Sequence, residues 1–205
     1  MRIPRALAAP LLSAALTAAA VSAAAADAAG ELRALLGSWS ELGADFRQLV
    51  VSGSDPSRVI AESSGRVYMR KPQSFLMHTT SPEESVLFSR PDGIYFYDPF
   101  VAQLNIYAAE LAAASPFVLL YAPTPQLWEG YGVERHGGRF VLTPREPHEF
   151  SRLELTFEGK DIREVKVFML DGNINTYTLS GVHGGLAADV FDCDIPEGTA
   201  INDER

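Results

Sequence analysis

Hydrophobic and polar residues alternate along most of the chain. In the segment 152–157 three apolar residues alternate with three polar ones, and the same period of two recurs at 164–169 and 191–195. This period predicts β-strands with one dry face and one solvated face. Turn-forming residues separate the segments, for example at 52–56, 91–93, 136–138 and 171–173. The pattern therefore favours about ten antiparallel strands in a sheet, sandwich or barrel.

Two segments break this alternation. Apolar residues recur at spacings of three and four between residues 31 and 46, which predicts a helix over 31–42 that stops near Gly43. The members of this stripe are Leu32, Leu35, Leu36, Trp39, Leu42 and Phe46. Residues 108–121 are rich in alanine, and Ser115-Pro116 is typical of a helix start, so we expect two short helices hinged there. So few helices cover little of a large sheet, which either closes around its own side chains or leaves an apolar hollow.

The first 26 residues have a different character. Arg2 and Arg5 precede the apolar run 6–20, and small residues up to Ala26 follow it. This order is typical of a secretory signal peptide. The apolar stretch is just long enough for a transmembrane anchor, but alanine inserts weakly into membranes. We expect cleavage after Ala26 and a single domain over residues 27–205.

Composition and charge exclude several classes of protein. The chain has 205 residues, of which 47% are hydrophobic and 21% charged, so one globular domain is expected. Its net charge is −9, and removal of residues 1–26 with their two arginines would make it −11. We therefore expect no nucleic-acid partner and no attraction to an anionic membrane surface.

The sequence contains no recognisable catalytic or metal-binding motif. Asp192 and Asp194 alternate with apolar residues and are expected on a solvated face, and Cys193 between them is expected to be an inert buried thiol. The segment 171–175 resembles the start of a calcium loop but lacks the glycine and glutamate that would complete it, so a hairpin turn is expected. The histidines stand at spacings that form no metal cluster: His78, His136, His148 and His183. We expect no enzyme activity, no cofactor and no metal.

A series of short motifs runs in order from about Asp45 to Asp203. The motifs are Phe46-Arg-Gln48, Gly65-Arg-Val-Tyr-Met-Arg-Lys-Pro-Gln-Ser-Phe75, Ser81-Pro-Glu-Glu-Ser85, Ile94 to Gln103, Ser115 to Leu120, Tyr131-Gly-Val133, Phe140 to Pro144 and Ile195-Pro-Glu-Gly198. Their order and spacing closely resemble the LolA family of periplasmic lipoprotein carriers. A signal peptide without a nearby lipid-anchoring cysteine fits this family and argues against LolB, the anchored outer-membrane acceptor.

The resemblance implies a mainly β fold, an open antiparallel half-barrel of about eleven strands covered by short lid helices around an apolar cavity. In that family the cavity takes the acyl chains of lipoproteins, which an inner-membrane ABC-type complex hands over and LolB receives. It implies a monomer that needs no cofactor and makes no covalent change. A periplasmic lipid-binding sensor and a lipid-modifying enzyme with the same barrel are the alternatives.

The resemblance also suggests site residues. In the family an arginine before the proline of the first hairpin ties the lid to the barrel. Here Lys71 precedes Pro72 and Arg70 precedes Lys71, and strand geometry places these two on opposite faces. We expect Lys71, with Arg70, to form the lid latch, and two solvated edge charges are the alternative. We expect the acyl-chain cavity to be lined by Phe75, Met77, Tyr95, Tyr97, Phe117 and Leu120.

Overall fold

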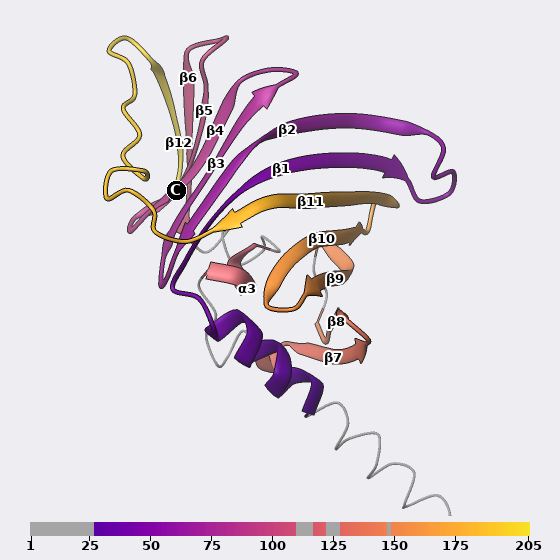
Figure 1. The fold of residues 1–205 in the computed structure, drawn as a ribbon. Coiled ribbons are helices and arrows are strands. Elements are labelled where there is room, and N and C mark those ends of the chain that lie inside the picture. The colour runs from indigo at the N-terminus through magenta and orange to yellow at the C-terminus, as the bar shows by residue number, and fades with distance from the viewer. Residues whose placement is uncertain (1–26, 110–116, 122–127, 147–148) are drawn as a thin grey trace, which may run out of the picture.

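The computed structural model describes residues 27–109, 117–121, 128–146 and 149–205, and twelve strands in these ranges form one sheet (Figure 1). Their bounds are β1 Glu41–Ser52, β2 Val59–Arg70, β3 Ser74–Ser81, β4 Ser85–Arg90, β5 Gly93–Asp98, β6 Gln103–Tyr107, β7 Tyr131–His136, β8 Arg139–Pro144, β9 Phe150–Glu158, β10 Asp161–Met169, β11 Asn173–His183 and β12 Ala200–Glu204. The described residues include an N-terminal helix over residues 27–37 and α3, Val118–Tyr121, and residues 109 and 128–129 are also helical.

The order of the strands shows that the sheet is open. It runs β12-β6-β5-β4-β3-β2-β1-β11-β10-β9-β8-β7, so β12 and β7 are its two ends. All neighbours pair antiparallel except β12, which runs parallel to β6. The predicted open, mainly antiparallel half-barrel is therefore confirmed, with one strand more than expected.

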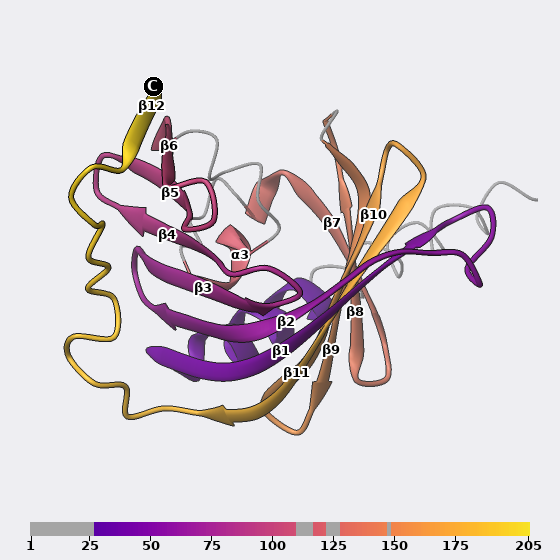
Figure 2. The ribbon, with the colours of Figure 1, turned by 90° about the horizontal axis from the view of Figure 1, so that it is seen from above.

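The sheet curves around the N-terminal helix and α3, which lie on its inner side (Figure 2). Ala28, Leu32 and Leu36 lie one turn apart on the helix and are all buried. They join one core cluster with the inward residues of the strands, among them Phe46, Val67, Met69, Phe75, Leu153 and Val165. Within the described residues, the N-terminal helix and α3 thus cover the inner face, and alternation along each strand supplies the surface that they cover.

The predicted helix over 31–42 ends earlier than expected. The helix stops at residue 37, where the backbone N–H of Ser38 donates to the Leu35 carbonyl (3.1 Å). Leu42 and Phe46 belong to β1, whose pairing with β2 and β11 on its two sides outweighs the helical spacing. Gly43 does not stop a helix, because it lies within β1, where an added Cβ would come within 2.7 Å of the His183 ring.

Other predicted elements are only partly covered by the described residues. The first predicted helix of 108–121 and the hinge at Ser115-Pro116 fall mainly outside them, whereas α3 lies within the second predicted helix. The predicted signal peptide, residues 1–26, also lies outside. The hairpin turn at 171–173 is confirmed, since the Asp171 carboxylate accepts a bond from the Asn173 backbone N–H (2.8 Å).

The outer face of the sheet carries a second apolar cluster. It comprises Leu76, Phe88, Tyr95, Leu104 and Ile106. The C-terminal segment, residues 184–199, runs along the outside of the sheet and covers it with Phe191, Cys193 and Ile195 (Figure 2). The predicted strand at 191–195 is therefore wrong, because this segment crosses the sheet without pairing to a neighbour. The predicted faces are correct, since Asp192 and Asp194 are exposed.

From the packing of this outer cluster we predict that Phe88→Ala strongly lowers the free energy of unfolding. Phe88 is 2% exposed, so its loss removes buried surface and leaves a cavity, and we expect a destabilisation of about 3–5 kcal/mol. Phe100→Ala is the matched control, because Phe100 is 88% exposed and its truncation should change stability by less than about 0.5 kcal/mol. Urea unfolding of the two variants measures both values. Equal effects would show that the C-terminal segment does not seal the outer face.

Candidate functional site

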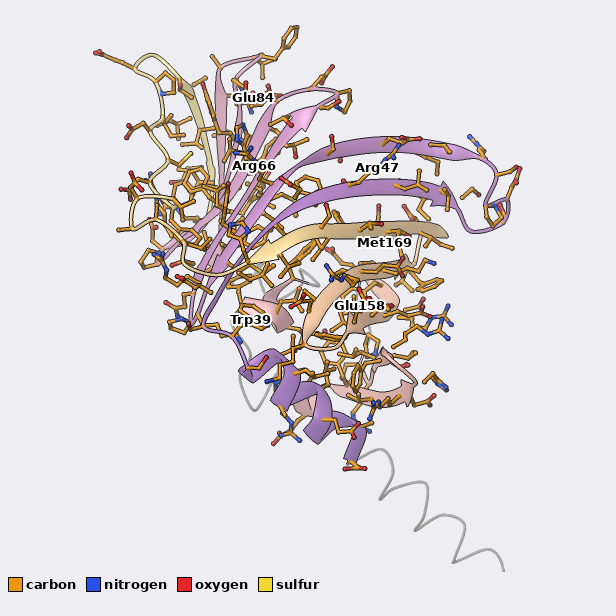
Figure 3. The ribbon with its side chains drawn as sticks, viewed as in Figure 1. Trp39, Arg47, Arg66, Glu84, Glu158 and Met169 are labelled. Atoms are coloured by element: carbon orange, nitrogen blue, oxygen red, sulfur yellow. The ribbon has the colours of Figure 1, made fainter. Side chains whose placement is uncertain are left out.

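Lys71 connects the β2–β3 hairpin to the end of the N-terminal helix. Its Nζ donates to the carbonyl oxygens of Leu36 and Trp39, the latter at 2.9 Å, and lies 3.7 Å from the centroid of the Trp39 ring. Its backbone N–H donates to the Ser40 carbonyl (2.9 Å). A helix C-terminus with free carbonyls favours a cation, and a tryptophan face adds a cation–π contact. Trp39 lies where the helix gives way to β1 (Figure 3).

The surroundings of Lys71 also change its titration. Burial disfavours the charged ammonium and lowers the pKa of Lys71 from 10.5 to about 8. The side chain is still mainly protonated at neutral pH, so it can donate to both carbonyls.

Arg70 points to the other side of the sheet, as strand geometry predicts. Its Nε lies 3.1 Å from a Glu41 carboxylate oxygen, and its guanidinium donates to the carbonyls of Leu186 and Ala187. The guanidinium also lies 4.9 Å from the centroid of the Phe191 ring. The structure thus places Arg70 against the start of the C-terminal segment, whereas Lys71 alone of the two contacts the helix.

Four of the six expected cavity residues lie together on the inner side of the sheet. Phe75, Met77, Phe117 and Leu120 are all buried in the inner cluster. The Phe75 ring centroid lies 5.8 Å from that of Phe117 and 5.3 Å from that of Tyr121. These aromatic contacts join β3 to the segment around α3, which therefore covers part of the inward face of β3.

Tyr95 and Tyr97, the other two expected cavity residues, lie on the outer face. Cross-strand pairing aligns Tyr95 with Phe88 and Leu76 of the outer cluster, and the Tyr95 hydroxyl donates to Asp92 (2.8 Å). Tyr97 packs against the same cluster. The residue of β5 that pairs with the inward Leu87 is Phe96. Strand β5 is apolar on both faces, and for that reason the sequence pattern did not distinguish them.

Sequence reasoning missed three members of the site. Trp39 was expected only as part of a helical stripe, yet it supports the Lys71 ammonium. Tyr121 stacks on Phe75, and Tyr177 meets the Phe117 ring edge-on at 4.9 Å. Burial raises the pKa of Tyr177 to about 12. Tyr121 ends a predicted helix and Tyr177 alternates with threonines, so both carried a weak signal as inward aromatic residues.

A pocket of about 370 Å³ adjoins the N-terminal helix elsewhere. It is lined by Glu31, Ala34, Leu35, Ser38, Arg135, Phe140 and Lys160. An ion pair between Arg135 and Glu31 (2.5 Å) joins the helix to β7 there. The helix is therefore held at two places, by Arg135 near its start and by Lys71 at its end.

Within the described ranges, no group of three or more His, Cys, Asp or Glu side chains could hold a metal ion. Two described histidines have acidic neighbours, since His78 contacts Glu84 (2.8 Å) and His136 contacts Glu134 (3.3 Å). Burial raises the pKa of the Cys193 thiol, which keeps it protonated. None of the described helices is both long and apolar enough to cross a bilayer.

Comparison with known families settles the relationship. The family model described as "Outer membrane lipoprotein carrier protein LolA" matches residues 38–194. The chain belongs to the LolA family.

Relatives of this LolA-family protein cover most of its length. A protein of Yersinia enterocolitica, named outer-membrane lipoprotein carrier protein, is 32% identical over 183 residues, which are 86% of this chain and 88% of that one. One of the same name from Vibrio cholerae is 34% identical over 166 residues, covering 79% of this chain and 83% of that one. The fold is also similar to an uncharacterized conserved protein from Thermus thermophilus, with a TM-score of 0.53, 12% identity and coverage of 87% of this chain and 98% of that one.

The lowered pKa of Lys71 predicts a pH dependence of stability. Between about 8 and 10.5 the unfolded chain binds a proton that the folded protein does not, so the free energy of unfolding should rise with pH in this window. We expect Lys71→Met to lose this rise. The measurement is urea unfolding of the wild type and the variant below, within and above the window. Lys160→Met, which changes an exposed lysine, should keep the wild-type profile.

Proposed function

We propose that this LolA-family protein is a periplasmic carrier that binds the acyl chains of lipoproteins released from the inner membrane and delivers them to an outer-membrane acceptor. The observation that carries the proposal is the apolar inner face of an unclosed sheet, covered by a helix that Lys71 holds at one end. The names of the relatives from Yersinia enterocolitica and Vibrio cholerae support the same role.

The remaining expectations fit this role. Residues 1–26 would act as the signal peptide that exports the chain, and residues 27–205 would form one carrier domain that works as a monomer. An inner-membrane ABC-type complex would supply the lipoprotein, and LolB would receive it. The carrier would bind and release without a cofactor and without a chemical step.

The energetics of lipid burial set limits on such a carrier. Complete burial of a chain of about fourteen methylenes is worth roughly 11 kcal/mol. Several chains buried in full would exceed the practical ceiling on affinity, near 20 kcal/mol, and the complex would scarcely dissociate. The carrier therefore needs partial burial of its cargo and a cover that costs free energy to displace.

The contacts of Lys71 suit such a cover. Displacing the end of the helix breaks two charge-assisted hydrogen bonds and one cation–π contact, and it exposes Leu32 and Leu36. Each charged hydrogen bond contributes about 1.5–3 kcal/mol. These contacts stabilise the closed, empty protein. Because bound cargo would keep the helix displaced, the same contacts favour release of the cargo, and Lys71 would act as the latch of the helical lid.

Native mass spectrometry of the purified protein with a triacylated lipoprotein tests the carrier role. We expect a complex with the acylated lipoprotein and none with the same polypeptide lacking its acyl chains. Binding of both forms alike would contradict the proposal, because the contact would then be made by the polypeptide. Conversion of the lipid to a new mass would instead support the lipid-modifying enzyme.

Lys71→Leu tests the latch. The substitution removes the ammonium contacts and so destabilises the closed, empty state. We therefore expect the variant to bind cargo more tightly and to release it to the acceptor at least about tenfold more slowly, as for the loss of one charged hydrogen bond. Lys71→Arg should restore release, and Lys160→Leu should leave it unchanged. The measurement is the rate at which a labelled lipoprotein moves from the carrier to the acceptor. Normal release by Lys71→Leu would rule the latch out.

A further inference from the structure

A row of polar side chains interrupts the apolar inner face of the sheet. Cross-strand pairing aligns Gln48 of β1 with Ser63 of β2 on one side and Tyr177 of β11 on the other. Asn175 lies two residues from Tyr177 on β11 and therefore on the same face. We call these four residues the polar row. It follows Phe46 along β1, where the strand changes from buried to half-buried.

Hydrogen bonds link the members of the polar row. The Gln48 Nε2 group donates to the Tyr177 hydroxyl oxygen (3.0 Å) and to the Asn175 Oδ1 (3.4 Å). The Ser63 hydroxyl donates to the Gln48 Oε1 (2.8 Å). Gln48 therefore uses its donors and its acceptor inside the row and fixes the orientation of the other three side chains.

Two donors of the row have no acceptor among the described residues. The Tyr177 oxygen accepts from Gln48, which leaves its own O–H proton free to donate, and the Asn175 amide N–H groups are also free. The Tyr177 donor lies beside an apolar surface, because the Tyr177 ring packs edge-on against Phe117 and near Phe46 (6.3 Å), and Asn175 is half-buried on the same face of β11. Binding sites use a few such half-buried polar groups beside an apolar surface to orient a ligand.

The charge of the row restricts what it can bind. All four side chains are neutral, and burial raises the pKa of Tyr177, so its hydroxyl keeps its proton at neutral pH. Arg47 and Glu62, which neighbour the row on β1 and β2, alternate with Gln48 and Ser63 onto the outer face and pair with each other (3.2 Å). Figure 3 labels Arg47 on this outer side. Neutral donors without a cation suit a neutral carbonyl oxygen better than a carboxylate or a phosphate.

We propose that the polar row is a subsite for the acyl carbonyl of the bound lipid, the group at which an acyl chain joins its polar part. This inference deepens the proposed carrier function and rests on it. The hydrocarbon would lie on the aromatic side of the row, toward Phe46 and Phe117, and Tyr177 and Asn175 would donate to the carbonyl oxygen. The row would thus set how far a chain enters the inner cluster.

Tyr177→Phe tests the subsite because it removes one hydroxyl and keeps the ring. The probes are 1,2-dioctanoylglycerol, which has ester carbonyls, and 1,2-di-O-octylglycerol, the ether that lacks them, each displacing N-phenyl-1-naphthylamine. We expect the variant to bind the ester about threefold to tenfold more weakly, as for the loss of one neutral hydrogen bond, and the ether as the wild type does. Tyr97→Phe, which removes a hydroxyl on the outer face, should change neither affinity.

The outcomes separate the two proposals. Unchanged ester binding by Tyr177→Phe, or an equal loss for ester and ether, would overturn the subsite and leave the carrier role intact. A wild type that binds neither lipid would overturn the carrier role and the subsite with it. A third probe, a fatty amide of the same chain length, distinguishes ester carbonyls from amide carbonyls. If Tyr177→Phe binds both the amide and the ester more weakly, the subsite takes any acyl carbonyl. If only ester binding weakens, the subsite is specific for esters. Asn175→Val should repeat the ester-selective loss through the second donor.

Discussion

The Lys71 ammonium binds the Leu36 carbonyl in the last turn of the N-terminal helix, the Trp39 carbonyl just beyond it and the face of the Trp39 ring, and this contact ties the end of the helix to the β2–β3 hairpin. Leu32 and Leu36 bring the helix onto the inner face by apolar burial, which is strong and non-directional. A directional polar contact at one end is different, because it is lost as soon as the helix moves. In the proposed carrier such a helix would be stable when closed, and its release would require the loss of the Lys71 contacts and of the Arg135–Glu31 ion pair.

The two faces of the sheet are closed in different ways. The C-terminal segment on the outer face is fastened at its start by Arg70, which binds Glu41 and two backbone carbonyls, and the chain end is held where Arg205 pairs with Asp92 (2.6 Å). Between them Arg90 donates to the Cys193 carbonyl (3.3 Å). The outer cover is tied along its length, whereas the inner cover includes short helices. Movement on the inner side would thus leave the sheet itself intact.

The sequence predicted the strands and most of their buried and exposed faces, because these follow from local alternation of apolar and polar residues. It did not predict features that depend on contacts between segments far apart in the chain. Leu42 and Phe46 fit both a helical stripe and a strand, and only their pairing with β2 and β11 separates the two. Tyr95 was expected inside because the C-terminal segment that covers it lies about a hundred residues away in the chain. Lys71 was found through family resemblance, but two of its partners are backbone carbonyls, which carry no sequence signal.

A polar row at the border of an apolar surface also bears on the problem of release. The free energy gained by burying an acyl chain increases with every methylene that enters. A purely apolar face would therefore bind long chains more tightly than short ones. A carbonyl that must remain at Tyr177 and Asn175 fixes the depth of insertion, because pulling it further inward would bury an unpaired polar group. The length of chain that is buried would then be set by the distance from the row to the helix cover. Such a limit keeps different cargoes within one range of affinity, which a carrier needs if the same acceptor is to unload them all.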